Sequence, residues 1–211
     1  NEKTIGLAIQ LYNEEWQWIL PTYQGVNHNN DLGLYRSQFW YARLASGDYG
    51  IGKLDLSKSY SKAPNTPLVC PTEKEPLFVT MSYHYAVNPL LCGSTSPAWS
   101  TKIKNVSFIL HASRALILAD SAVINSAAPA FYTSNGLAYR HDEGELREMP
   151  SDLAALPSSS RKAHLYYLDH HVEAASQPEI RKKPFTPEAK VWGANAYYEN
   201  FMTSGFKPIL K

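Results

Sequence analysis

The stretch 163-AHLYYLDHHVEA-174 predicts a β-hairpin. A run rich in aromatic and apolar residues, typical of a strand, leads into Asp169, His170 and His171, and a second extended segment follows. We place Asp169 and His170 at the corner of a two-residue type I′ turn, in which both central residues have positive φ. Asp and His are among the non-glycine residues that tolerate this conformation. A three-residue turn that includes His171 is the alternative.

The same three residues are potential metal ligands, so a metal site is the competing interpretation. His170 and His171 are adjacent and would point to opposite faces of an extended chain, which prevents both from binding one ion. A site assembled from His141, Asp169 and His171 would suit Zn²⁺. We favour the turn, and the sequence analysis assigns no metal ligand, cofactor-binding residue or catalytic residue.

Three earlier segments also have β character. They are LVC (68–70), LFVTMSYHYAV (77–87) and RALILAD (114–120), and the last has the continuous apolar run of a buried strand. AHLYYL (163–168) is the next strand along the chain. Because these strands follow one another, we expect them to form an antiparallel sheet.

Helical periodicity precedes the strands. Residues 2–15 have an apolar stripe at helical spacing, and 31–46 form a second amphipathic segment with Asp31 as a plausible cap and Gly47 after its end. The first helix has no deliberate N-cap, so we interpret it as the last turns of a longer helix. The stripe consists of Ile5, Ala8, Ile9, Tyr12 and Trp16, and Leu7 and Leu11 widen it.

Helices followed by strands predict an α+β fold in which the N-terminal helix packs on an antiparallel sheet. At 211 residues the chain forms one domain, 1–211, with long loops. Residues 142–162, rich in Pro, Ser and acidic side chains, are interpreted as a surface insertion. The tail, 175–211, is expected to wrap the domain, and its aromatic residues are Trp192, Tyr197, Tyr198, Phe201 and Phe206.

Composition and motifs exclude several function classes. The 20 basic and 19 acidic residues give a net charge of +1. The sequence has no cluster of Lys and Arg of the kind that binds a phosphate backbone, so we do not expect a nucleic-acid partner. Neither a G-x-S-x-G elbow nor a local signature of an activated cysteine is present, so we predict that the chain is not an enzyme. Cys70 is a structural thiol or half of a disulfide with Cys92, and Ser113 and Asp120 are strand-end residues.

Seven segments, in order, resemble the bacterial type II secretion pseudopilins that carry a prepilin-type cleavage/methylation signal and a C-terminal H-x9-DG motif. The chain departs from the motif in that Asp169 follows His141 by 28 positions instead of ten, and His170 stands in place of glycine. A further departure is Ala112 in place of the usual proline. The segments are NEKTIGLAIQLY (1–12), WQWILP (16–21), LVCPTE (68–73), SYHYAVN (82–88), SRALILADS (113–121), YRH (139–141) and LYYLDHHVE (165–173).

The resemblance implies a pilin-like subunit that acts by assembly in protein export. Residues 1–18 would be the end of the pilin helix, and a preceding apolar segment would anchor the protein in the inner membrane and pack against other pseudopilin subunits. The globular part would face the periplasm or the cell surface, where Cys70 and Cys92 could pair. The separate fragment would be monomeric or only weakly associating.

Other functions remain open at this stage. Related pseudopilins can hold calcium, and Asp142, Glu143 and Glu145 are the nearest carboxylate group, although they lack EF-hand spacing. The aromatic tail would suit a secreted carbohydrate-binding module. A metal-dependent hydrolase would use the trio His141, Asp169 and His171.

Overall fold

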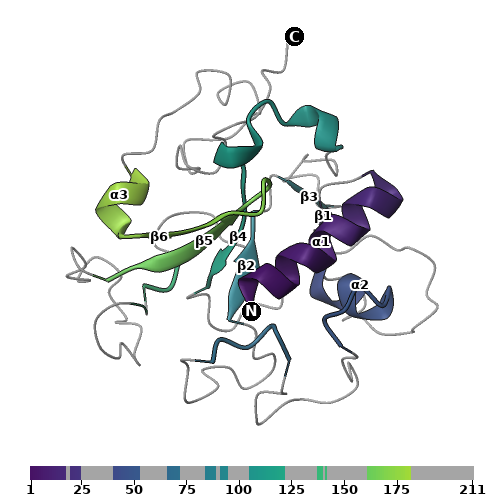
Figure 1. The fold of residues 1–211 in the computed structure, drawn as a ribbon, viewed down its shortest axis with the longest axis horizontal. Helices are drawn as coiled ribbons and strands as arrows, with labels where there is room; N and C mark the ends of the chain where they lie inside the picture. Colours follow the sequence, from purple (N-terminus) through teal and green to yellow (C-terminus); the bar gives the residue numbers. More distant parts are fainter. Residues whose placement is uncertain are drawn as a thin grey trace.

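A computed structural model describes ten parts of the chain, which include a long N-terminal helix and an antiparallel sheet (Figure 1). These parts are residues 1–17, 20–24, 40–52, 66–71, 84–88, 91–94, 105–121, 137–139, 141 and 161–181.

Helix α1 (Glu2–Trp16) confirms the predicted N-terminal helix. The predicted apolar stripe is buried from Ile5 to Tyr12. Leu7 and Leu11, which were expected to widen this stripe, are instead 55% and 41% exposed, because they lie on the opposite face of the helix. The helix ends where Gln17 adopts a left-handed conformation and donates its backbone N–H to Asn13 O at 2.8 Å.

Helix α1 packs on a four-stranded antiparallel sheet with the strand order β2-β4-β5-β6. The strands are β2 (Tyr85–Val87), β4 (Leu116–Asp120), β5 (Ala163–Tyr167) and β6 (Val172–Ala175). All five residues of β4 are buried, as expected for a central strand that is covered on both faces. The combination of an N-terminal helix with this sheet is the α+β arrangement that the sequence predicts.

Further short elements flank the helix and the sheet. Strands β1 (Leu20–Gln24) and β3 (Cys92–Ser94) pair in parallel, so not every strand belongs to the antiparallel sheet that was expected. Helix α2 (Trp40–Ser46) lies beside α1, and α3 (Gln177–Arg181) follows β6 (Figure 1). Two short 3₁₀ helices, η3 (Val106–Phe108) and η4 (Ala112–Arg114), precede β4.

Two strand predictions need correction. Residues 68–70 were expected to be extended, but they form turns and irregular backbone. Arg114 and Ala115 precede the strand that was predicted over 114–120, since the chain first passes through η4. Parts of other predicted elements, residues 31–39 and 77–83, lie outside the described residues.

The hairpin is confirmed, but its turn differs from the predicted one. The backbone N–H of His170 donates to Tyr167 O at 2.9 Å, and the N–H of Tyr167 donates to His171 O at 3.1 Å. The loop is therefore the three residues 168–170. His170 has a φ of 72°, whereas Asp169 is not in the positive-φ region. This pattern matches a type I turn closed by one left-handed residue, and it rejects both a type I′ turn and a loop that includes His171.

Among the helices of the described residues, none combines the length and the apolar character that crossing a bilayer requires.

Candidate functional site

A buried polar cluster lies at the end of the sheet where α1 begins. Asp120, the last residue of β4, is completely buried. One carboxylate oxygen, Oδ2, accepts a hydrogen bond from the backbone N–H of His164 at 2.8 Å and lies 3.0 Å from His141 Nε2. The other oxygen, Oδ1, makes no hydrogen bond with the described residues. A buried carboxylate normally has partners for both oxygens, so this one is underused.

His141 is held against Asp120 by its backbone and its ring. Its backbone exchanges two hydrogen bonds of 3.1 Å with Lys162, next to the start of β5. Its ring stacks on that of His164, with centroids 3.8 Å apart and planes 8° from parallel. The pKa of His141 is raised to about 10. The Asp120 carboxylate makes the largest contribution and the Cys70 side chain the second, while burial opposes the rise. The contact with Asp120 is an ion pair rather than a well-directed hydrogen bond.

Cys70 approaches the cluster from the segment 66–71. In the structure Cys70 is a buried free thiol and not half of a disulfide. Its backbone N–H donates to His84 Nδ1 at 2.8 Å, and His84 in turn donates its own N–H to Leu68 O at 3.0 Å. The Asn1 side chain donates to Val69 O. These contacts fix Cys70 between α1 and β2.

Glu2 enters the cluster from the first turn of α1. Only 6% of its surface is exposed, and neither carboxylate oxygen makes a hydrogen bond with the described part of the chain. Burial, assisted by the nearby Asp120, raises the pKa of Glu2 to about 9. The nearby His141 and the N-terminal amino group oppose this rise in the pKa.

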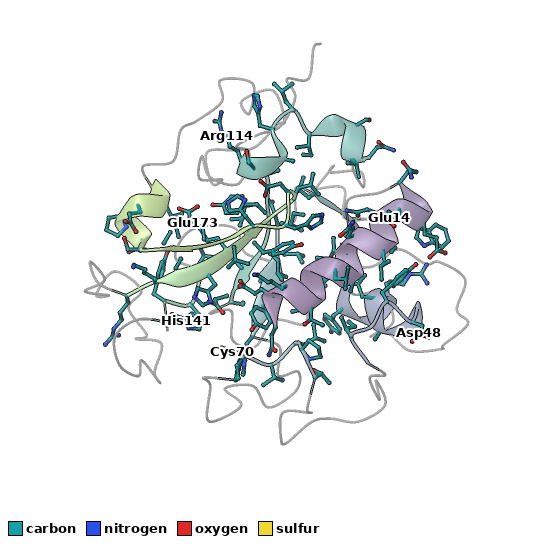
Figure 2. All side chains as sticks on the ribbon, viewed as in Figure 1. Glu14, Asp48, Cys70, Arg114, His141 and Glu173 are labelled. Atoms are coloured by element: carbon teal, nitrogen blue, oxygen red, sulfur yellow. The ribbon has the colours of Figure 1, made fainter. Side chains whose placement is uncertain are left out.

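The side chains of this cluster converge closely enough to share an ion. One ligand atom each from Cys70, Asp120 and His141 lie within 4.8 Å of one another, and so do those from Glu2, Asp120 and His164. Figure 2 shows Cys70 and His141 near the start of α1. Sulfur, imidazole nitrogen and carboxylate oxygen together form a ligand set suited to Zn²⁺.

The sequence pattern does not predict most of this cluster, although it contains one signal. Glu2 stands three residues before Ile5 and seven before Ile9, and so the helical period places its carboxyl group on the buried face. Asp120 was interpreted as an ordinary strand-end residue. Asp120 and His141 are separated by 20 intervening residues, and only the folded sheet brings them together.

The trio His141, Asp169 and His171 does not form a site. Asp169 and His171 do contact each other, through Oδ1 and Nδ1, in the exposed turn between β5 and β6. His141, however, pairs with Lys162 at the opposite end of β5. With a rise of about 3.3 Å per residue, the length of this strand separates the two places by roughly 15–20 Å. One ion cannot bind all three residues.

Two other candidates lie outside the described residues. They are the carboxylate group proposed for calcium (Asp142, Glu143 and Glu145) and the aromatic group of the tail (Trp192, Tyr197, Tyr198, Phe201 and Phe206).

The second functional feature is the outer face of α1. Leu7 and Leu11 are one helical turn apart and both exposed, and Trp16 at the end of the helix is 48% exposed. Trp16 is tied to the turn after α2, because its indole N–H donates to the Tyr49 hydroxyl at 2.9 Å. The two leucines thus form an apolar strip on a helix whose other face is fixed to the sheet.

No family model, no curated protein and no solved structure matches this chain.

Proposed function

We propose that the chain is the globular part of a pilin-like filament subunit of the type II secretion pseudopilus class. It would act by assembly in protein export and not by bond chemistry. The observation that carries the proposal is the position of α1: one face of the helix packs on the sheet, and Leu7 and Leu11 project from the other face. The order of the sequence motifs supports the same conclusion.

The division of α1 into two faces suits a subunit whose helix forms the axis of a filament. In the natural protein the helix would continue toward the N-terminus through about 20 apolar residues, enough to span a bilayer. Neighbouring subunits would pack these segments together, and Leu7 and Leu11 would extend the same apolar strip into the globular part. The sheet would then coat the filament on the periplasmic side or at the cell surface.

The test uses the protein encoded by the full-length gene, in cells that express the rest of the assembly machinery. Variants L7E and L11E place a charge on the outer face of α1 and should abolish cross-linked multimers, since a charge in a helix–helix contact remains unpaired. Leu110→Glu is the matched control, because Leu110 is also exposed, at 54%, but lies outside α1. Normal multimers with L7E and L11E would overturn the proposal, as would a gene without an apolar segment upstream of Asn1.

A further inference from the structure

We propose that Cys70, Asp120 and His141, together with Glu2, bind one zinc-type transition-metal ion beneath the first turn of α1. This site is independent of filament assembly and differs from the Asp169–His171 turn.

The first argument is the convergence of three different donor types. Ligand atoms that all coordinate an ion about 2.0–2.3 Å away lie roughly 3.3–4 Å apart in a tetrahedral site. Those of Cys70, Asp120 and His141 are already within 4.8 Å of one another. Small side-chain movements would complete the geometry. The backbone of each residue is held by hydrogen bonds or sheet pairing, and so the site is largely pre-formed.

The second argument is the unused carboxylate of Glu2. Both of its oxygens are buried and make no hydrogen bond with the described residues, and Oδ1 of Asp120 is in the same situation. The ligand atom of Glu2 lies within 4.8 Å of that of Asp120, which belongs to both groups of ligands. Two buried carboxylates side by side repel each other when ionised, whereas a divalent cation between them removes the repulsion.

The donor set selects the class of metal. A thiolate and an imidazole favour Zn²⁺ and similar transition metals over Mg²⁺ and Ca²⁺, which prefer oxygen ligands. Cys70, Asp120 and His141 supply three protein ligands, and Glu2, whose carboxylate lies close to that of Asp120, is the proposed fourth ligand. Structural zinc sites have four protein ligands. The ring of His164, stacked on His141, would hold that ligand in orientation.

The predicted role is structural. Glu2 belongs to α1, Cys70 to the 66–71 segment and Asp120 to the end of β4. His141 is bridged to Lys162, next to the start of β5. One ion would therefore fasten the beginning of the helix to the sheet at the position where a filament would pull on it.

The experiment is a titration of the metal-free 211-residue chain with Co²⁺, followed by competition with Zn²⁺. The expected result is one equivalent bound, tetrahedral visible absorption and a thiolate-to-cobalt charge-transfer band, all removed by Zn²⁺. C70S should lose the charge-transfer band, and E2Q should keep it while raising the Kd by about tenfold or more. Two controls should behave like the wild type: Cys92→Ser, which removes the other thiol, and the double variant Asp169→Ala/His171→Ala, which removes the exposed pair.

The wild-type titration decides the question even if C70S does not fold. Absence of a charge-transfer band, or absorption typical of six oxygen ligands, would overturn the proposal. A band that survives in C70S but disappears in C92S would also overturn it, because the thiolate would then belong to another site. Loss of metal binding in the Asp169→Ala/His171→Ala variant would assign the metal to the turn instead.

Discussion

At the scale of single residues, Glu2 occupies a helix position whose period places it among apolar side chains. It follows the spacing of Ile5, Ile9 and Tyr12, and all four are buried. A carboxylate in such surroundings is costly when it is charged and unpaired, and so in the metal-free chain Glu2 holds its proton well above its ordinary pKa of 4.5. Its position has no obvious use in packing, which makes a ligand role the simpler explanation.

The proton on Glu2 predicts how stability depends on pH in the metal-free protein. Folding raises the pKa of Glu2 from 4.5 to about 9 and that of His141 from 6.5 to about 10. Between pH 6.5 and about 9 the folded state therefore holds protons that the unfolded state has released, and stability falls as the pH rises. Each such proton makes the free energy of unfolding decrease with pH, by on the order of 1 kcal/mol per pH unit at most.

Thermal unfolding in the presence of a chelator checks this prediction. The melting temperature should be lower at pH 9 than at pH 6.5, and Glu2→Gln, which cannot ionise, should show a smaller decrease. Equal melting temperatures at the two pH values would contradict the assigned environment of both groups.

The turn residue His170 makes a second prediction possible at this scale. Its φ of 72° is strained for every residue except glycine. Its ring Nδ1 lies 2.5 Å from the Tyr166 hydroxyl. Replacement by Ala removes the contact and keeps the strain, whereas replacement by Gly removes both. His170→Gly should therefore be more stable than His170→Ala by about 1 kcal/mol in urea denaturation. Equal stability of the two variants would argue against the left-handed conformation.

At the scale of elements, the contact between α1 and β5 depends on a residue without a side chain. A Cβ atom on Gly6 would lie 2.0 Å from the ring of Tyr166, which is buried and held by its contact with His170. The absence of a side chain at position 6 thus sets how closely the helix approaches the sheet.

Gly6→Ala should destabilise the protein even though alanine is the better helix former. The gain in helix propensity is at most about 1 kcal/mol, and overpacking a rigid contact costs about 1–3 kcal/mol. Urea denaturation should show a net loss, while Leu7→Ala on the exposed face should change stability by no more than about 0.5 kcal/mol. A Gly6→Ala variant as stable as the wild type would show that the helix can move away from β5 at little cost.

The elements that the sequence predicted correctly are those determined by local pattern. The helix of residues 2–15 follows from apolar spacing, and β5 and β6 follow from β-rich runs on either side of polar turn residues. The turn itself was predicted at the right place but with the wrong type, because Asp169 and His170 permit several turns. The hydrogen bond from Tyr167 N–H to His171 O fixes the loop at three residues and so selects one of these turns.

The parts that failed depend on contacts between distant segments. Residues 68–70 look like a strand because they are apolar, yet they pair with no strand of the described residues. Leu68 and Cys70 are instead hydrogen-bonded to His84. The cluster around Asp120 likewise joins residues from five separate segments. Helical and strand periodicity do not contain this information, and so the site could not be derived from the sequence.

At the scale of the whole molecule, α1 connects the two proposed properties. Glu2, on its inner face, lies in the buried cluster, and Leu7 and Leu11 are exposed on its outer face. If a filament transmits force along the helix, the load reaches the domain at residues 1–6, next to Asp120 and Cys70. A metal ion there would resist separation of the helix from the sheet without occupying the surface needed for assembly.

The 211-residue chain by itself should remain monomeric. Stable protein interfaces bury about 1,200–2,000 Å², far more than the exposed sides of Leu7 and Leu11 can provide, so association should require the apolar segment proposed upstream. Sedimentation velocity over a hundredfold range of concentration should give one monomeric species. A Leu7→Ser/Leu11→Ser variant should sediment identically. A concentration-dependent dimer that this double variant abolishes would show instead that the outer face of α1 suffices for self-association, and the filament would then be held together partly by its globular domains.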